Sequence, residues 1–349
     1  MKNQGVRSKV KVIARLPNWV GDLVLATPFV HALRDAFPDA EITVVGRRPA
    51  LELIESNPFV DRIIPIRRRG ITEAKNIRDQ GPFDIGFVLP PSFSSAAFLT
   101  LVGAERRIGY ETDRRGSLLT DALPEPVGVI HRADSYLKLI EHVIGRNQLH
   151  MAYHTEIHLT DKDFVKINDI LPNLKRPLIV LNPNSEAPSR RWPPIYWIEL
   201  GKALCQKDVS IILVGGPFDV TRTRRIAHEI GCDRVINLAG QLHLRELAAL
   251  LSSADLVVSN DTGPMHISYT VGTKTIALFG AGDERVTGPY RSPDVAIVMR
   301  APDVQCAPCG KNYCPLNHKR CMWELKPDLV LAKIEEILMD EKWKANEHS

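Results

Sequence analysis

Long hydrophobic runs and a strong net charge are both missing from this sequence. No stretch reaches the ~18 unbroken apolar residues that a membrane-spanning helix needs, which excludes a polytopic membrane protein. Lysine and arginine number 45 against 41 aspartates and glutamates, so the formal net charge is only +4. This balance argues against a nucleic acid partner, because proteins that bind nucleic acid usually carry a strongly basic face.

The N-terminus of this sequence does not predict a secretion signal. The first nine residues are basic, but the apolar stretch behind them contains Arg15 and Asp22 and has no clean small-residue cleavage site. We therefore expect a cytoplasmic protein.

Length and composition fit a soluble protein with two domains. The chain has 349 residues, of which 44% are hydrophobic and 25% are charged. These values exclude global disorder and a collagen-like fibre. At ~100–200 residues per domain, the length predicts two domains. Such a chain buries large cores without needing disulfides or metals to fold.

The apolar spacing predicts two α/β units of similar size. Expected strands cover 9–14, 41–45, 62–65 and 85–89, then 177–182, 209–214, 235–237, 255–259 and 275–279. Expected helices cover 22–37, 50–56 and 71–79, then 196–207, 219–230, 244–252, 264–271 and 326–342. Repeated strand–helix–strand units indicate parallel sheets covered on both faces. We place the first domain at 1–168, the second at 169–325 and a C-terminal helix at 326–349.

A Gly21-Asp22 pair follows the first expected strand. In open parallel sheets, ligands bind beyond the carboxyl ends of the strands. Asp22 therefore has two interpretations, a cap of the following helix or a general base that faces a ligand.

A second polar motif runs from Ser259 to His266 and contains Asn260-Asp261-Thr262-Gly263-Pro264-Met265. It joins an expected strand to an expected helix. Helix N-termini carry free N–H groups and partial positive charge, so they bind phosphate. An ordinary capped helix with a packed histidine remains the alternative.

A third polar loop, residues 182–193, follows a buried strand and ends in Arg190-Arg191-Trp192-Pro193. A cation here would neutralise a diphosphate, whereas an isolated arginine pair is more often solvated. Runs of two or three arginines in the first half of the chain have the same two interpretations, a solvated face or an anion site. They are Arg67-Arg68-Arg69, Arg106-Arg107 and Arg114-Arg115.

Four of the six cysteines, Cys306, Cys309, Cys314 and Cys321, cluster near the C-terminus. Their number is typical of a metal site, and His318 lies inside the run. The spacing does not form two regular Cys-x2-Cys knuckles. A structural metal, a reduced thiol cluster and a redox-sensitive pair all remain open.

Taken together, these motifs resemble the ADP-heptose:lipopolysaccharide heptosyltransferases of glycosyltransferase family 9. The matching residues are Gly21-Asp22, the Arg190–Pro193 run and the Ser259–His266 run. The order of strands and helices between them also matches, so the resemblance covers nearly the whole chain. The cysteine cluster makes the chain most similar to heptosyltransferase II.

The resemblance implies a GT-B fold, with two Rossmann-like domains that face each other across a cleft. It implies inverting transfer of L-glycero-D-manno-heptose from ADP-heptose to the inner core of lipopolysaccharide, with a heptose-Kdo-lipid A acceptor. The C-terminal helix would cross back to the first domain. No obligatory cofactor is implied.

The resemblance also implies roles for individual residues. Asp22 matches the family's catalytic base. The donor-binding residues would be Ser185, Arg190, Leu242, Asp261, Thr262, Gly263 and His266. Arg190 stands where the family usually has lysine, which keeps the charge but changes the geometry. The acceptor would meet the first domain, including Arg67, Arg106, Arg107 and Arg114.

Other functions remain open at this point. They are a heptosyltransferase I-type enzyme, another nucleotide-sugar transferase of the same fold and a non-catalytic nucleotide- or lipopolysaccharide-binding module. Because the acceptor would be lipid-linked, we expect peripheral contact with the inner face of the inner membrane. We expect a monomer.

Overall fold

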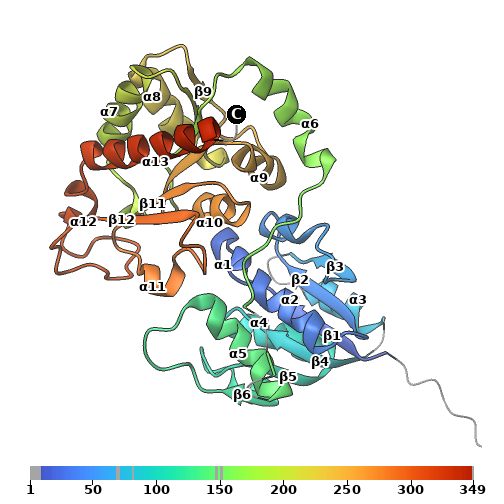
Figure 1. Ribbon diagram of the computed structural model, residues 1–349. Coiled ribbons are helices and arrows are strands. Elements are labelled where there is room, and N and C mark those ends of the chain that lie inside the picture. The colour runs from blue at the N-terminus through green and yellow to red at the C-terminus, as the bar shows by residue number, and fades with distance from the viewer. Residues whose placement is uncertain (1–8, 68–70, 81, 146–147, 150–151, 348–349) are drawn as a thin grey trace, which may run out of the picture. The chain divides into compact units, whose positions relative to one another are not determined.

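The computed structural model describes residues 9–67, 71–80, 82–145, 148–149 and 152–347 (Figure 1). The chain divides into two compact units, Met1–His158 and Leu159–Ser349. Each unit contains one parallel sheet of six strands. The division falls at 158/159, ahead of the boundary at 168/169 that the sequence suggested.

The first unit has the doubly wound strand order β3-β2-β1-β4-β5-β6, and all of its strand pairs are parallel. This order reverses direction between β1 and β4, where such folds bind ligands. The strands are β1 (Lys11–Arg15), β2 (Glu41–Gly46), β3 (Arg62–Pro65), β4 (Phe83–Val88), β5 (Ala104–Tyr110) and β6 (Asp121–Leu123).

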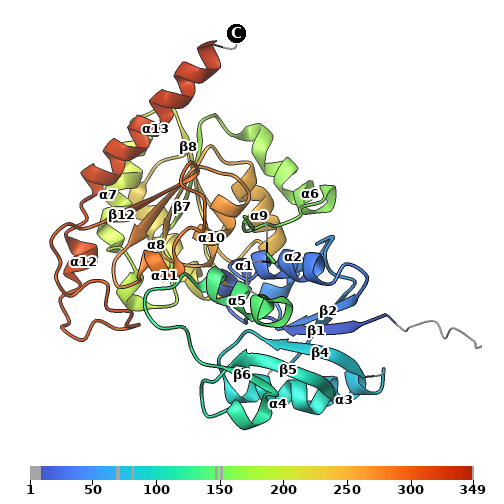
Figure 2. The same cartoon turned by 60° about the horizontal axis from the view of Figure 1, so that its bottom comes forward.

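Helices cover both faces of this first sheet (Figure 2). One face carries α1 (Val20–Val24), α2 (Thr27–Ala36) and α5 (Arg132–Ile144), and the other carries α3 (Ile71–Arg78) and α4 (Phe93–Val102). Short 3-10 helices η1 (Ala50–Ile54) and η2 (Gly116–Leu118) complete the unit. The buried β1 and β4 side chains share an apolar core with α3 and α4.

The first unit differs from the sequence prediction in several places. Strands β5 and β6 and helices α4 and α5 are additional to the expected elements. The helix expected at 22–37 is broken into α1 and α2. Thr27 ends the first piece, because its Oγ1 donates to the backbone oxygen of Val24 at 2.7 Å, and a proline follows at the start of α2. The helix expected at 50–56 is the shorter 3-10 helix η1.

The second unit repeats the doubly wound order, as β12-β11-β10-β7-β8-β9. Its strands are β7 (Leu178–Asn182), β8 (Ser210–Leu213), β9 (Val235–Asn237), β10 (Leu256–Asn260), β11 (Thr275–Phe279) and β12 (Ala296–Arg300). Its helices are α6 (Asp161–Ile170), α7 (Pro194–Cys205), α8 (Val220–Ile230), α9 (Leu244–Ser252), α10 (Gly263–Thr270), α11 (Glu284–Thr287), α12 (Arg320–Trp323) and α13 (Pro327–Glu347). The 3-10 helices are η3 (Leu171–Asn173), η4 (Pro188–Arg190) and η5 (Pro217–Asp219). Strand β7 lies beside β10, so the order again reverses between them.

The C-terminal helix α13 packs on the second unit, where it lies along α7 (Figure 1). Its Val330, Ile334 and Ile337 are buried in the same apolar core as Trp192 and Trp197. The contact division therefore counts α13 with the second unit. The expected crossing of this helix back to the first domain stays a prediction.

Helix α6 explains why the second unit begins at Leu159. Thr160 and Asp163 form a capping box at its start. Asp163 also accepts two hydrogen bonds from Arg245 of α9, at 2.7 and 2.6 Å, and both side chains are largely buried. This bidentate pair ties the start of the unit to its core.

Within the part of the chain that the structure describes, no helix is long and apolar enough to cross a bilayer.

Asp163→Asn is expected to lower the free energy of unfolding by roughly 3 kcal/mol at pH 7, because it leaves Arg245 buried without its charge partner. Burial by itself raises the pKa of Asp163, but hydrogen bonds from Arg245 and Thr160 outweigh burial and lower it. The stabilisation is therefore present above the unfolded-state pKa of about 3.9 and is lost as the pH falls through the folded-state value.

Urea unfolding of both proteins between pH 3 and 7 measures this effect, with Asp161→Asn as the control because Asp161 is exposed on the same helix end. The difference in unfolding free energy between Asp163→Asn and the unmodified protein should shrink as the pH falls below about 4. A difference that stays constant there would contradict the ion-pair explanation.

Candidate functional site

The polar motifs of the second unit gather at the carboxyl ends of β7 and β10. These two strands are hydrogen-bonded neighbours, with Ser259 of β10 in register with Asn182 of β7. Both strands are fully buried, so the loops that follow them emerge side by side. The strand order reverses here, which is where doubly wound sheets bind their ligands.

An ion pair joins the two loops. Nη1 of Arg190, at the end of η4, lies 3.1 Å from Oδ2 of Asp261. The side chain of Asp261 is 1% exposed and that of Arg190 is 27% exposed. The carboxylate is therefore covered, and the guanidinium is the accessible part of the pair. Among the described residues, the buried Nε of Arg190 has no hydrogen-bond partner.

Ser185 and Trp192 fix the loop after β7 against the loop after β10. Ser185 Oγ donates to the backbone oxygen of Asp261 at 3.3 Å. The backbone N–H of Trp192 donates to Asn260 Oδ1 at 3.0 Å. Burial and the nearby Arg222 lower the pKa of Arg191, whose Nε donates to the backbone oxygen of Ser185 at 2.7 Å. Arg191 therefore braces the loop through its backbone, whereas Arg190 pairs with a carboxylate of the neighbouring loop.

Helix α10 starts directly after this ion pair. Thr262 is its N-cap residue, in extended conformation, and makes no side-chain capping bond. In its first turn Pro264 has no N–H, and the N–H of Met265 donates to the backbone oxygen of Thr262 at 3.0 Å. The partial positive charge at the strand edge is therefore that of the helix dipole. His266 is buried at 4% exposure, and its Nδ1 lies 3.2 Å from the hydroxyl of Tyr269.

Leu242 lies at the same edge of the sheet but further along it. It follows β9, which is two strands away from β7 in the sheet order. Its loop is held to the end of β8, because the N–H of Gly240 donates to the backbone oxygen of Gly215 at 2.9 Å. Leu242 is half-buried. The structure thus brings Ser185, Arg190 and Asp261 into contact and places Leu242 to one side of them.

Sequence reasoning missed Gly282, which follows β11. A Cβ atom built on Gly282 would lie 2.0 Å from Oδ2 of Asp261, so the loop backbone packs directly against this carboxylate. Arg300 of β12 holds the loop by donating to the backbone oxygens of Gly280 at 2.8 Å and Gly282 at 3.0 Å. The available signal was the Gly280-x-Gly282 spacing directly after an apolar strand.

Asp22 lies at the corresponding edge of the first unit, in the loop and helix that follow β1. The N-cap of α1 is Trp19, and Asp22 is a half-buried residue of the first turn. Its carboxylate is close enough to the buried Tyr136 of α5 to raise the pKa of that phenol, although burial is the larger cause. Asp22 therefore lies near α5 and is not the N-cap of its helix.

Arg15 at the end of β1 was also missed. It is 3% exposed, and it donates to the backbone oxygen of Leu16 and, at 2.5 Å, to Asn18 Oδ1. Burial and the nearby Arg47 lower the pKa of Arg15 to about 10. Arg15 thereby shapes the loop that leads to Asp22. A charged residue at the end of an otherwise apolar strand was the available signal.

The arginines expected at an acceptor site are not brought together as one group. Arg67 is 94% exposed and pairs with Glu73 at 3.7 Å, and Arg68 and Arg69 lie outside the described residues. Arg106 and Arg107 lie within β5, ahead of its carboxyl end. Arg106 pairs with Asp121 at 2.8 Å, and Arg107 donates to backbone oxygens.

The last doublet divides into one exposed and one buried residue. Arg114 is exposed in the turn after β5. Arg115 is fully buried and donates to the backbone oxygens of Tyr110 and Pro90. Burial lowers the pKa of Arg115 to about 10. Arg115 is thus a structural brace, and Arg114 is the member of this pair that is open to a ligand.

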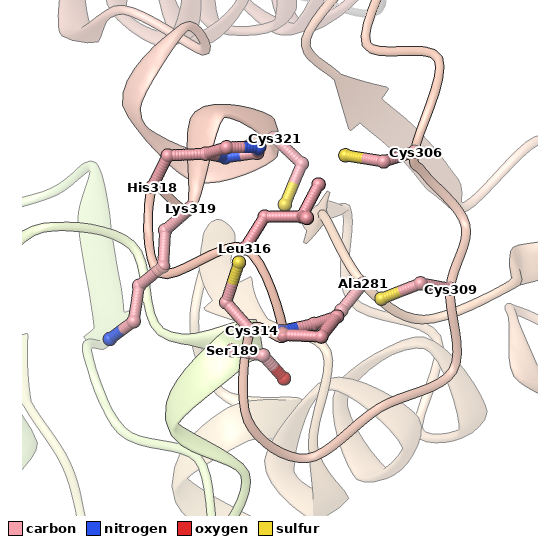
Figure 3. A pocket seen from close by; sticks show the side chains of 10 residues that line it. Ser189, Ala281, Cys306, Cys309, Cys314, Leu316, His318, Lys319 and Cys321 are labelled. Carbon is pink, nitrogen blue, oxygen red and sulfur yellow. The ribbon is translucent and has the colours of Figure 1, made fainter.

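The four clustered cysteines line one pocket in the second unit (Figure 3). None of them forms a disulfide. Burial, together with the thiols of Cys306, Cys309 and Cys314, raises the pKa of Cys321. Backbone N–H groups that point at the sulfur of Cys314 lower its pKa, the largest effect coming from Lys319.

Comparison with known proteins identifies the family. The sequence profile of glycosyltransferase family 9 (heptosyltransferase) matches residues 74–320. The chain belongs to this family. It is therefore a glycosyltransferase, as the sequence motifs predicted.

Relatives of this glycosyltransferase match it over nearly their full lengths. Lipooligosaccharide heptosyltransferase 2 of Campylobacter jejuni serotype O:6 is 26% identical, over 94% of this chain and 99% of the relative. Lipopolysaccharide heptosyltransferase 2 of Escherichia coli K12 is 24% identical, over 95% and 100%. These relatives confirm the predicted likeness to heptosyltransferase II.

Solved structures confirm the GT-B fold of the glycosyltransferase. The family 9 glycosyltransferase of Veillonella parvula gives a TM-score of 0.83 at 22% identity, covering 96% of this chain and 99% of the other. E. coli ADP-heptose heptosyltransferase II gives 0.80 at 23% identity, covering 95% and 100%.

Gly282→Ala is expected to lower the stability of the glycosyltransferase by about 1–3 kcal/mol, because the added methyl group overlaps the buried carboxylate of Asp261. Thermal unfolding measures the change. Gly216→Ala is the matched control, since a Cβ there would meet only Asp219 Oδ2, at 3.6 Å. Equal melting temperatures for the two variants would show that the loop accommodates the methyl group without a loss of stability.

Proposed function

We propose that this glycosyltransferase transfers L-glycero-D-manno-heptose from ADP-heptose to the inner core of lipopolysaccharide, with inversion at the sugar. The acceptor is heptose-Kdo-lipid A, which makes the enzyme a heptosyltransferase II. The two heptosyltransferase 2 relatives support the sugar and the pathway. The likeness to E. coli ADP-heptose heptosyltransferase II supports ADP-heptose as the donor.

The observation that carries this proposal is the ion pair between Arg190 and Asp261 at the start of α10. A partly exposed guanidinium and the positive end of the α10 dipole at one sheet edge suit a diphosphate. The ion pair with Asp261 holds Arg190 in place. Because the Asp261 carboxylate is buried, it does not present its negative charge to the phosphates. Ser185, Thr262, Gly263 and His266 complete the proposed diphosphate site, and Leu242 contacts the adenine through its backbone.

In the proposed reaction, an acceptor hydroxyl attacks the anomeric carbon of the heptose. Asp22 takes the hydroxyl proton as the new glycosidic bond forms. The bond between the sugar and the diphosphate breaks, and ADP leaves with the bonding electrons. The α10 N-terminus and Arg190 stabilise the negative charge that develops on the leaving group. These groups supply the electrostatic stabilisation without an obligatory metal.

The two units divide the substrates between them in this proposal. The first unit binds the acceptor, and Arg114 and Arg67 are its most accessible candidate contacts, beside Arg106 and Arg107. The second unit binds ADP-heptose. We propose that the enzyme works as a monomer in the cytoplasm and meets its lipid-linked acceptor at the inner face of the inner membrane.

Asp22→Ala is expected to reduce turnover by roughly 10²–10⁴-fold, because the acceptor hydroxyl loses its base. Binding of ADP should be unchanged, since the proposed nucleotide site belongs to the second unit. Release of ADP from ADP-heptose, measured with defined truncated lipopolysaccharide acceptors, gives the rate.

The control for this variant is Asp39→Ala, which removes an exposed carboxylate from the same unit. Near-normal turnover of Asp22→Ala would make Asp22 a helix residue without a catalytic role. A panel of ADP-heptose, UDP-sugars and GDP-sugars in the same assay separates this donor from those of other nucleotide-sugar transferases.

Arg190→Ala is expected to weaken ADP binding by roughly 10- to 100-fold, the effect of losing a hydrogen bond to a charged group. His266→Ala should weaken it as well. Isothermal titration calorimetry with ADP measures both affinities. Arg225→Ala is the matched control, because Arg225 is 81% exposed on α8 and pairs with Glu229 of the same helix. Unchanged affinity in both site variants would place the nucleotide elsewhere.

A further inference from the structure

The proposed reaction makes no use of the cysteine loop, which we define as residues 306–321. Figure 3 shows the sulfurs of Cys306, Cys309, Cys314 and Cys321 turned toward one common space. These four side chains line a small cavity of about 40 Å³ together with Ser189 and Ala281. Residues that are up to fifteen positions apart in the loop therefore converge on one place.

We propose that these four thiols bind one thiophilic divalent cation, zinc or iron, and that the bound ion braces the donor-site loops. Four sulfur ligands in a tetrahedral set are typical of these two metals. Each thiol gives up its proton to solvent as the metal binds. The bracing part of this inference rests on the proposed function, whereas the metal site does not.

Formation of the site requires the thiols to move closer together. Among the described residues, no three histidine, cysteine or acidic groups are already arranged to hold a metal ion. Three of the four cysteines lie in irregular backbone between β12 and α12, and only Cys321 lies in a helix, which is four residues long. Closure therefore needs side-chain rotation and a loop adjustment, and it disrupts no strand of the sheet.

The surroundings of the cluster suit bound thiolates. Backbone N–H groups of Leu316, Asn317, His318 and Lys319 are directed at the sulfur of Cys314. Such N–H groups stabilise negative charge on sulfur. Four thiolates around a divalent ion leave a net charge of −2, and the loop also carries Lys311, Lys319 and Arg320, which offset it.

The cysteine loop is bonded to both sides of the donor site. On one side, Ser189 is 1% exposed, its N–H donates to the backbone oxygen of Asn312 at 3.1 Å, and its Oγ donates to that of Lys311. Ser189 directly precedes Arg190. A metal that fixes the loop would therefore fix the turn that carries the proposed diphosphate ligand.

On the other side, the N–H of Gly310 donates to the backbone oxygen of Ala281 at 2.7 Å. Ala281 directly precedes Gly282, whose backbone packs against the carboxylate of Asp261. The cysteine loop thus supports both members of the Arg190–Asp261 ion pair through their neighbours. Loss of the metal should loosen both supports together.

The first test is the metal content of the full-length protein, purified under reducing conditions without a metal-affinity step. Inductively coupled plasma mass spectrometry should find about one zinc or iron per chain. Cys309→Ser combined with Cys314→Ser should lose the metal, whereas Cys232→Ser should keep it. Cys232 is the matched control because it is a free cysteine of the same unit that lies outside the cluster.

A second measurement does not depend on whether the double variant folds. The reduced, metal-free protein is titrated with Co²⁺, which gives a thiolate-to-cobalt charge-transfer absorption when cysteines bind it. Saturation at one equivalent supports the site. Metal-free purified protein together with no such absorption would overturn the proposal, and so would a metal that stays bound in the double variant.

The bracing role is tested by calorimetry with ADP on the metal-bound and metal-free protein. Removal of the metal should weaken ADP binding at least several-fold, and addition of the metal should restore it. Equal affinities would overturn the bracing role. Failure of the metal-bound protein to bind ADP at all would count against the proposed function and leave the metal site standing.

Discussion

The candidate donor site depends on the pairing of β7 with β10. Parallel strands end at the same sheet edge, so this pairing brings the loop after Asn182 next to the loop after Asn260. The Arg190–Asp261 ion pair and the bond from Trp192 to Asn260 then fix the two loops to each other. Without this strand order, residues about seventy positions apart would have no reason to meet, and the α10 N-terminus would lack its cationic partner.

The two units use one architecture for different chemistry. Both sheets reverse their strand order between the first and fourth strands, and each reversal is followed by polar residues. In the second unit these residues supply positive charge, which suits a leaving diphosphate. In the first unit, a buried Arg15 shapes the loop that leads to the half-buried carboxylate of Asp22. A carboxylate and a partly exposed guanidinium therefore lie at the reversal points of the two separate sheets of this glycosyltransferase.

Residues that the proposed reaction does not use support the loops of the candidate donor site. Gly282 is small enough to let the loop after β11 rest on Asp261, and Arg300 holds that loop by its backbone oxygens. Arg191 looks equivalent to Arg190 in the sequence, yet it bonds the backbone of Ser185 and braces the loop. The position of one guanidinium thus depends on packing and hydrogen bonds from at least three neighbouring segments.

Apolar spacing and turn residues in the sequence were enough to predict much of the local structure. They placed the strands at 62–65, 235–237 and 275–279 where the structure has them, and the polar runs after strands marked Asp22 and the Ser259–His266 motif. Local pattern could not separate Arg190 from Arg191, give Asp22 its neighbour Tyr136, or show that Gly282 covers Asp261. Periodicity reports which face of a strand or helix is apolar, whereas these contacts join segments far apart in the chain. Only the strand order and the packing of the folded units decide which of those segments meet.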